Sequence, residues 1–144
     1  MKNKTIATVL AFLGGPLGLH RFYLHGWRDP WGWLLPLPTL AGLVGVIRLR
    51  QFGVDDQLGW LLAPLLGFTI AGCALMAIFL GLSPIERWNQ RFNPHCSPKA
   101  AAGTTNWLTV TAVALALLAG TTALMAALAF TFQHYFEYQS LRQP

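Results

Sequence analysis

Charged residues are scarce in this chain of 144 residues. Lys, Arg, Asp and Glu make up 10% of it, whereas 54% of its residues are hydrophobic. Soluble domains carry about 25% charged residues, and a soluble surface on a chain of this length needs more charge than this. Intrinsic disorder requires the opposite composition, with low hydrophobicity and high net charge. The composition therefore excludes both classes and predicts an integral membrane protein.

Cysteine is also rare, with only Cys73 and Cys96. We expect both thiols to be free, because Cys73 lies in an uncharged stretch and Cys96 in a loop, at different depths of a membrane. The histidines and cysteines form no ligand set with zinc-type spacing. The chain also lacks the GxSxG, HExxH, P-loop and GxGxxG motifs. We therefore expect no metal, no cofactor and no enzymatic activity.

What the sequence does contain is long uncharged stretches. The charged residues gather in five islands, which leave four stretches without charge, at 5–19, 30–47, 57–85 and 100–136. About 20 apolar residues in a helix cross a bilayer core of roughly 30 Å. The third and fourth stretches are long enough outright, and they predict helices over 58–82 and 107–132.

The first two stretches are short for a crossing. The first reaches across only as a helix over about 4–24, with Lys4 snorkelling to the surface and a distortion near Gly14-Gly15-Pro16. A cleavable signal peptide is the alternative for this segment, although no small-x-small cleavage site follows it. The second contains Pro36 and Pro38, which force a kink or a late start, and we place its helix at 31–48. The sequence thus predicts an all-α, polytopic membrane protein with four transmembrane helices in two hairpins.

These segments give a domain plan. It consists of a membrane hairpin over 1–50, a loop over 51–57, a second hairpin over 58–132 and a carboxy-terminal tail over 133–144. Within the second hairpin, Ser83-Pro84-Ile85-Glu86 fits a capping box. The box predicts a short interfacial helix over 84–92 with Ser83 as N-cap, and a capped extension of the third helix is the alternative.

Four crossings place both termini on one side of the membrane. The ten Lys and Arg residues then divide five to each side, so the positive-inside rule does not choose an orientation.

Two sets of residues are candidates for structural roles in the membrane. Small residues spaced four apart allow helix backbones to approach closely, and the candidates for such packing are Gly14, Gly18, Ala41, Gly45, Ala116 and Gly120. Large aromatic residues near helix ends favour the membrane–water interface, and the candidate anchors are Trp27, Trp31, Trp33, Trp88 and Phe92.

The first turn, between the two helices of the first hairpin, combines aromatic and basic side chains. Such a turn at headgroup level serves as an interfacial anchor, or it recognises a lipid phosphate or another membrane protein. The candidate binding residues are His20, Arg21, Phe22, Tyr23, His25 and Arg28. The net charge of +5 favours anionic headgroups as partners, besides a membrane protein partner or a second copy of the chain. Charges scattered between spans do not indicate nucleic acid.

The amino-terminal third also resembles a known family. Lys4, Ala7, Leu10-Ala11-Phe12-Leu13-Gly14, Gly18 and His20-Arg21-Phe22-Tyr23-Leu24 are similar to the motif of the TM-two domain family, called the NINE protein family in bacteria. The resemblance covers about residues 1–50 and implies a two-helix membrane hairpin, in a bacterial inner membrane, without established enzymatic chemistry.

Two departures from the family pattern matter. His25 occupies the position of the motif's final glycine, with Gly26 one place later. The Trp and Asp usual near the end of the second helix are missing, since Gly45-Val46-Ile47-Arg48-Leu49-Arg50 stands there.

These observations together predict a non-catalytic integral membrane protein that binds lipid or a membrane protein partner through its first turn. A small oligomeric transporter or channel is the alternative. Intramembrane ionisable residues typically mark a transport path, and the four expected helices carry no Asp, Glu, Lys or Arg at mid-depth. Only the proline and glycine breaks favour the alternative.

Overall fold

The computed structural model describes residues 1–142, with side chains through Ser140. Within these residues every regular element is helical, which confirms the expected all-α class. The elements are α1 (Lys4–Leu13), η1 (Gly15–Leu17), α2 (Leu19–His25), α3 (Pro30–Leu34), α4 (Pro36–Phe52), α5 (Gln57–Leu82), α6 (Ile85–Phe92), η2 (Ala101–Gly103) and α7 (Trp107–Arg142).

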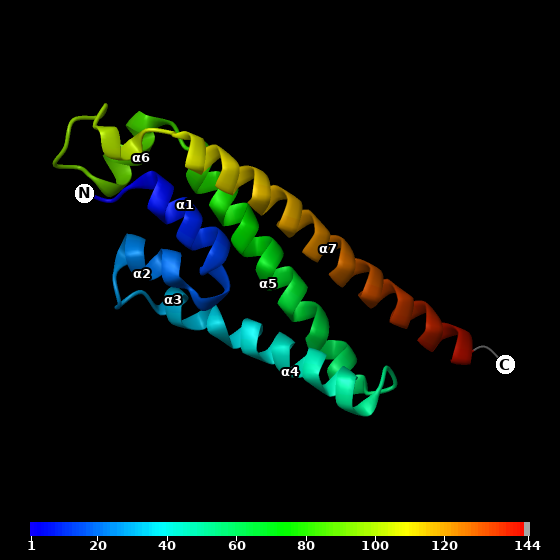
Figure 1. Ribbon diagram of the computed structural model, residues 1–144. Helices are drawn as coiled ribbons and strands as arrows, with labels where there is room; N and C mark the ends of the chain where they lie inside the picture. The colour runs from blue at the N-terminus through cyan, green and yellow to red at the C-terminus, as the bar shows by residue number, and fades with distance from the viewer. Residues whose placement is uncertain (143–144) are drawn as a thin grey trace.

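Helix α5 is the central element, and α4 and α7 run antiparallel to it on either side (Figure 1). On the α4 side, Gly42 lies against Leu66 and Gly45 against Ala63, so close that a Cβ on either glycine would overlap the α5 backbone. The two α5 positions decrease by three as the α4 positions increase by three, which is the register of a straight antiparallel pair. Glycine therefore permits this close approach of α4 to α5.

Glycine also permits the close approach of α5 to α7. Gly67 of α5 lies against Ala127, and Gly120 of α7 lies against Ala74. Each glycine thus faces an alanine of the other helix, and Ala127 and Ala74 are both buried. Close backbone approach provides the van der Waals contact that holds helices together in lipid.

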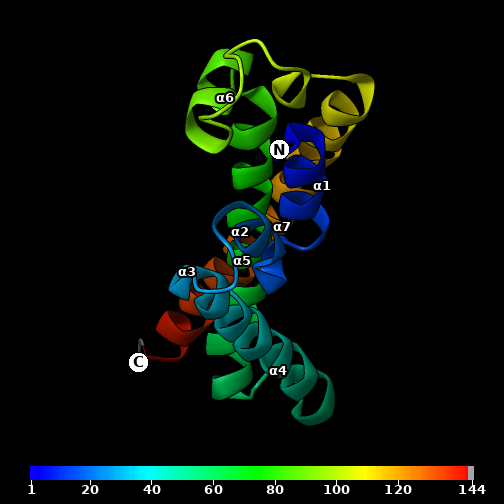
Figure 2. The same ribbon diagram turned by 90° about the vertical axis from the view of Figure 1, so that its left-hand side faces the viewer.

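The bundle has two ends, which lie at opposite extremes of α5 and α7 in Figure 1. The amino end carries the amino terminus, α6 and the first residues of α7. The carboxyl end carries the loop at 53–56, between α4 and α5, and the last residues of α7. Figure 2 shows α1 and α6 together at one end and the end of α4 at the other.

The first segment does not form the single helix expected over 4–24. Helix α1 ends at Leu13, the short helix η1 follows with Pro16 in its first turn, and Gly18 takes a left-handed conformation with φ +75°. Glycine adopts the left-handed conformation at little steric cost, and at Gly18 this conformation changes the direction of the chain. The distortion expected near Gly14-Gly15-Pro16 is therefore a complete reversal of direction.

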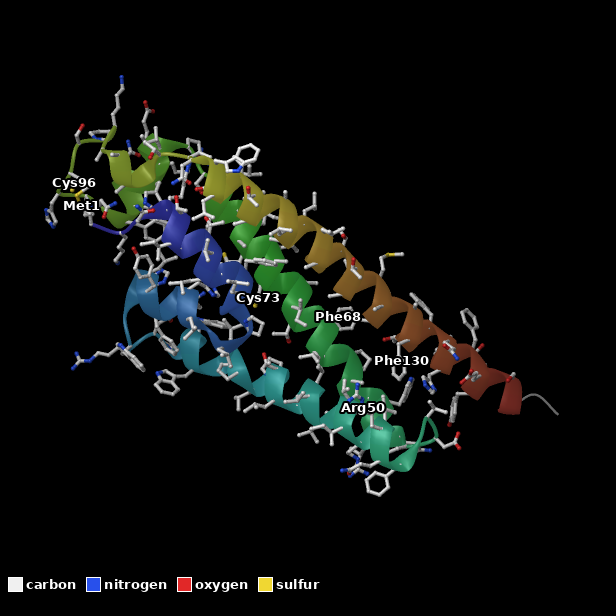
Figure 3. The ribbon with its side chains drawn as sticks, in the orientation of Figure 1. Met1, Arg50, Phe68, Cys73, Cys96 and Phe130 are labelled. Carbon is white, nitrogen blue, oxygen red and sulfur yellow. The ribbon has the colours of Figure 1, made fainter. Side chains whose placement is uncertain are left out.

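Contacts show how deep this reversal lies. Going along α1, Thr8 approaches Gly81 of α5, and Gly15 approaches Cys73. Cys73 is nine residues before the end of α5 at Leu82, which corresponds to about 14 Å at the helical rise. The turn therefore lies near the middle of α5 (Figure 3, Cys73).

Helix α2 then returns to the amino end. The His25 ring lies edge-on to the ring of Phe92 in α6, with centroids 6.2 Å apart, and Lys2 Nζ donates to the carbonyl oxygen of Leu24. Residues 4–25 thus enter and leave the bundle at one end. We call this unit, α1–η1–α2, the re-entrant hairpin.

The number of long apolar helices follows from this reversal. Three segments are long and apolar enough to cross a membrane: Pro30–Phe52, Gln57–Leu82 and Ala101–Ser140. Helix α1, with 10 residues, spans about 15 Å, half of a bilayer core. The expected arrangement of four spans in two hairpins is therefore not confirmed.

Three further expectations need correction. The helix expected over 31–48 runs from Pro30 to Phe52, into the loop expected over 51–57, with a single break at Leu35 just before Pro36. Ser83 is the C-cap of α5 rather than the N-cap of the next helix, because its hydroxyl donates to the Phe79 carbonyl, and Pro84 takes the N-cap position of α6. The tail expected from residue 133 continues α7 to Arg142, since no proline or glycine interrupts it.

Lys4 differs from expectation as well, because it does not snorkel. Its side chain is 1% exposed, and Nζ donates to the Ser83 carbonyl at 3.0 Å and the Thr105 hydroxyl at 2.6 Å. A cation at the carboxyl end of α5 is favoured by the helix dipole. Beside it, the Thr5 hydroxyl bonds Thr109. The start of α1 is therefore fastened to residues about a hundred positions later.

Candidate functional site

The first turn, residues 20–33, is built around an ion pair. Arg21 Nε donates to Asp29 Oδ2 at 2.6 Å, and Asp29 Oδ1 caps α3 by accepting the Trp31 backbone N–H. The Arg21 guanidinium, through its hydrogen bond, holds the pKa of the Asp29 carboxyl below its ordinary value. One carboxylate thus joins α2 to the start of α3.

Three aromatic rings form a cluster on this turn, in which the two tryptophans are exposed and Phe22 is half-buried. Phe22 stacks on Trp27 with centroids 5.3 Å apart and an interplanar angle of 14°, and it meets Trp33 edge-on at 5.3 Å. The Trp33 indole N–H donates to the Trp27 carbonyl at 3.0 Å. Trp27 and Trp33 are 74% and 59% exposed. We call Phe22, Trp27 and Trp33 the aromatic cluster.

Two of the candidate binding residues face the interior instead. His20 is 3% exposed, and its Nδ1 has no hydrogen-bond partner among the described residues. Tyr23 packs against the core, and its hydroxyl accepts the Asn3 backbone N–H at 2.8 Å. These two side chains hold the re-entrant hairpin in place rather than presenting a surface.

The two remaining candidates are exposed. Desolvation, followed by the nearby Arg21 charge, lowers the pKa of His25 from its ordinary 6.5, so the imidazole is neutral at pH 7. Arg28 follows the aromatic Trp27 and makes no hydrogen bond or ion pair within the described residues. Arg28 is therefore the guanidinium of the first turn that is available to a ligand.

A small cavity lies beneath the first turn, between α2, α3 and the middle of α5. Its volume is about 140 Å³, and His20, Arg21, Trp31 and Cys73 are among its lining residues. The lining is mainly apolar. Within the described residues no three His, Cys, Asp or Glu side chains come together as a metal-binding group.

The candidate anchors divide into exposed and buried residues. Trp31, like the two tryptophans of the aromatic cluster, is mostly exposed. Trp88 is 1% exposed, and its indole N–H donates to the Lys2 carbonyl at 3.0 Å. Phe92 is half-buried against it, with ring centroids 4.5 Å apart. Trp88 is therefore a core residue and not an interfacial anchor, because the folded-back amino terminus covers it.

The candidate packing residues also have different surroundings. Gly45, Ala116 and Gly120 lie in helix contacts or are fully buried. On α4, Gly42 approaches α5 and Ala41 is half-buried, and Gly14 and Gly18 serve the reversal of the hairpin. Gly42, Gly67 and Gly81 were not predicted as packing residues, although each lies in close contact with a neighbouring helix.

Basic residues are unevenly divided between the two ends. Seven of the ten Lys and Arg residues belong to the amino end, namely Lys2, Lys4, Arg21, Arg28, Arg87, Arg91 and Lys99. Two of the five acidic residues, Asp29 and Glu86, accompany them. The other three cations, Arg48, Arg50 and Arg142, share the carboxyl end with Asp55, Asp56 and Glu137. The amino end thus carries the whole net charge of the chain.

Comparison with known protein families gives a match at the amino-terminal end of the chain. The family model of the TM2 domain matches residues 1–52, the segment that contains the re-entrant hairpin, the first turn and α4. No curated protein and no solved structure matched the chain. The match covers 52 of the 144 residues, and the three long apolar helices make the chain a membrane protein. Residues 1–52 of this membrane protein are therefore similar to the TM2 domain.

Proposed function

We propose that this chain is a non-catalytic integral membrane protein whose first turn binds anionic lipid headgroups. The observation that carries the proposal is the pairing of the exposed tryptophans of the aromatic cluster with Arg28, a guanidinium that has no partner within the described residues. Tryptophan rings favour the headgroup level of a bilayer, and an arginine fork matches the oxygens of a phosphate. The TM2 domain match fits a location in the inner membrane of a bacterium.

The surroundings of the turn support an anionic ligand. Seven of the ten Lys and Arg residues lie at this end of the bundle, against two of the five acidic residues. Each basic residue near an anionic surface contributes about 1 kcal/mol of attraction. Asp29 is not available to repel a phosphate, because its oxygens are engaged with Arg21 and with the start of α3.

The structure changes the role that we give to Arg21. The guanidinium of Arg21 is committed to Asp29 through Nε, so its main contribution is to shape the turn. Arg28 has no such commitment and is exposed. The proposal therefore assigns phosphate contact to Arg28 and positioning to Arg21.

Lipid selectivity tests the proposal. The full chain is reconstituted into vesicles with spin-labelled phosphatidylglycerol or spin-labelled phosphatidylcholine, and the motionally restricted fraction of each lipid is measured. We expect a preference for phosphatidylglycerol that Arg28→Gln lowers about fivefold, the equivalent of one basic residue at the surface. Arg50→Gln is the matched control, since it removes the same charge from an exposed position at the opposite end.

The result has two readings. A loss of selectivity with Arg28→Gln and not with Arg50→Gln supports lipid binding by the first turn. Equal selectivity in the wild type and both variants overturns the proposal, and the turn is then an anchor.

A further inference from the structure

A second hollow lies at the carboxyl end of the bundle, at the opposite end from the first turn. Its volume is about 490 Å³, within the range of about 300–1,000 Å³ that is usual for ligand sites. The loop at 53–56, the start of α5 and the last turns of α7 enclose it. The lining residues that matter here are Asp55, Trp60, His134, Glu137 and Tyr138.

Aromatic rings form one wall of this hollow. The Trp60 ring packs on His134 with centroids 5.5 Å apart, and His134 packs in turn on Phe130 at 4.7 Å. Tyr138, one helical turn after His134, also lines the hollow. The Trp60 indole nitrogen is buried and has no hydrogen-bond partner among the described residues. The wall therefore consists of aromatic rings, with the indole N–H of Trp60 buried behind it.

The charged lining residues are both carboxylates. Asp55 is exposed and makes no hydrogen bond or ion pair within the described residues. Glu137 accepts the side-chain amide of Gln133 at 3.0 Å and lies 3.6 Å from His134 Nδ1. No Lys or Arg lines the hollow in the part of the chain whose side chains are described.

The ion pair between Arg48 and Asp56 does not neutralise the charge of these carboxylates. Arg48 donates from Nε and Nη2 to the two oxygens of Asp56 at 2.8 and 2.9 Å, and Asp56 also caps α5 through the Gly59 N–H. Arg48 is therefore neutralised by Asp56 and does not offset the charge of Asp55. Among the described side chains, the lining of the hollow therefore places two carboxylates, Asp55 and Glu137, beside its aromatic wall.

We propose that this hollow binds an organic ammonium group. Ring faces of Trp and Tyr attract cations through their quadrupole, and the two carboxylates add a direct electrostatic attraction. The site lies at helix ends, where aqueous solution and lipid headgroups are both accessible. The ammonium therefore comes either from a free amine or from an aminophospholipid headgroup.

Indole resonances of Trp60 provide the test. The full chain, labelled with ¹⁵N-tryptophan in detergent micelles, is titrated with ethanolamine, with short-chain phosphatidylethanolamine and with short-chain phosphatidylglycerol. Trp60→Phe assigns the resonance. We expect a saturable shift with an ammonium-bearing probe, and an affinity about tenfold lower in the double variant Asp55→Asn, Glu137→Gln, equivalent to about 1.4 kcal/mol. Glu86→Gln is the matched control, since it removes one exposed carboxylate at the amino end.

Each outcome decides the proposal. A saturable shift with ethanolamine identifies a free amine as a ligand, and a shift with phosphatidylethanolamine alone identifies a lipid headgroup. An equal response to phosphatidylglycerol, or an unchanged affinity in the double variant, overturns the proposal. The indole signals of the other five tryptophans report whether each variant remains folded.

Discussion

At the scale of single residues, the ion pair of Arg21 and Asp29 gives the first turn a defined pH dependence. The pKa of Asp29 lies below its ordinary value of 3.8, first through the hydrogen bond from Arg21. The stability from this pair is therefore complete above about pH 4 and is lost as the pH falls through the lowered pKa.

We expect Asp29→Asn to lower the thermal unfolding midpoint by an amount that stays constant from pH 7 to about pH 4 and shrinks below it. Unfolding in detergent, followed by circular dichroism for the wild type and the variant, measures this difference. A difference that shrinks between pH 7 and pH 5 would contradict the assignment, since the carboxylate is ionised throughout that range.

Lys4 gives a second prediction at this scale. Lys4→Met keeps the aliphatic stem and leaves the Ser83 carbonyl and the Thr105 hydroxyl without their donor. Loss of hydrogen bonds to a buried charged group costs about 1.5–3 kcal/mol. We expect a destabilisation of that size in chemical unfolding, whereas Lys99→Met, at an exposed position, leaves stability unchanged. Equal stability of both variants would show that Lys4 is not fastened to α5.

At the scale of helices, glycine determines how closely α4 and α5 pack. Gly42→Ala places a Cβ on the backbone of Leu66, which has no flexible atom to move aside, while a Cβ at Gly72 meets nothing within 4 Å. We expect Gly42→Ala to destabilise the protein by about 1–3 kcal/mol through overpacking. The matched variant Gly72→Ala is neutral or gains up to about 1 kcal/mol from helix propensity.

Unfolding of the two glycine variants by the same denaturant separates these effects. Equal loss in both would mean that the flexibility of glycine, rather than the contact of α4 with α5, determines stability.

The sequence alone predicts those helices that are specified by a continuous run of neighbouring residues. The helix expected over 58–82 is α5 within one residue, because an uninterrupted apolar run specifies it. The re-entrant hairpin was not predictable in this way. Its fold-back depends on hydrogen bonds from Lys4 and Thr5 to Thr105 and Thr109, which a scan for hydrophobic length does not detect.

The candidate site was predictable to a similar degree. Its aromatic and basic composition is visible in the sequence, and Trp27 and Arg28 are exposed as that composition suggests. The inward orientation of His20 and Tyr23 was not predictable from the sequence. It follows from the left-handed conformation of Gly18 and from the hydrogen bond between Tyr23 and the Asn3 backbone. The hollow at the carboxyl end joins residues 55 and 138, too far apart for a local motif.

At the scale of the whole molecule, the number of membrane crossings decides whether the positive-inside rule gives an orientation. Four crossings divided the basic residues equally, whereas three do not. With three crossings the two ends of the bundle lie on opposite sides of the membrane, and Lys and Arg divide seven to three in favour of the amino end. Basic loops remain in the cytoplasm. We therefore predict that the amino end is cytoplasmic and that the carboxyl end faces outward.

Labelling with a membrane-impermeant maleimide tests this orientation. Cys96, at the amino end (Figure 3), should react only after the cells are lysed. Val54→Cys, in a Cys96→Ser background, should react in intact cells, because Val54 is 65% exposed at the carboxyl end. Reaction of both or of neither in intact cells would place the two ends on one side.

The contacts of α1 also affect the order in which the helices reach their final positions during synthesis. A ribosome adds about 5–20 residues per second, so Lys4 and Thr5 are made several seconds before Ser83, Thr105 and Thr109. During that interval Lys4 and Thr5 lack these hydrogen-bonding partners, and α1 is too short to span the bilayer. We therefore expect α1 to wait at the membrane surface until α5 and α7 are inserted. Helix α1, although synthesised before α5 and α7, is then the last of the three to reach its place.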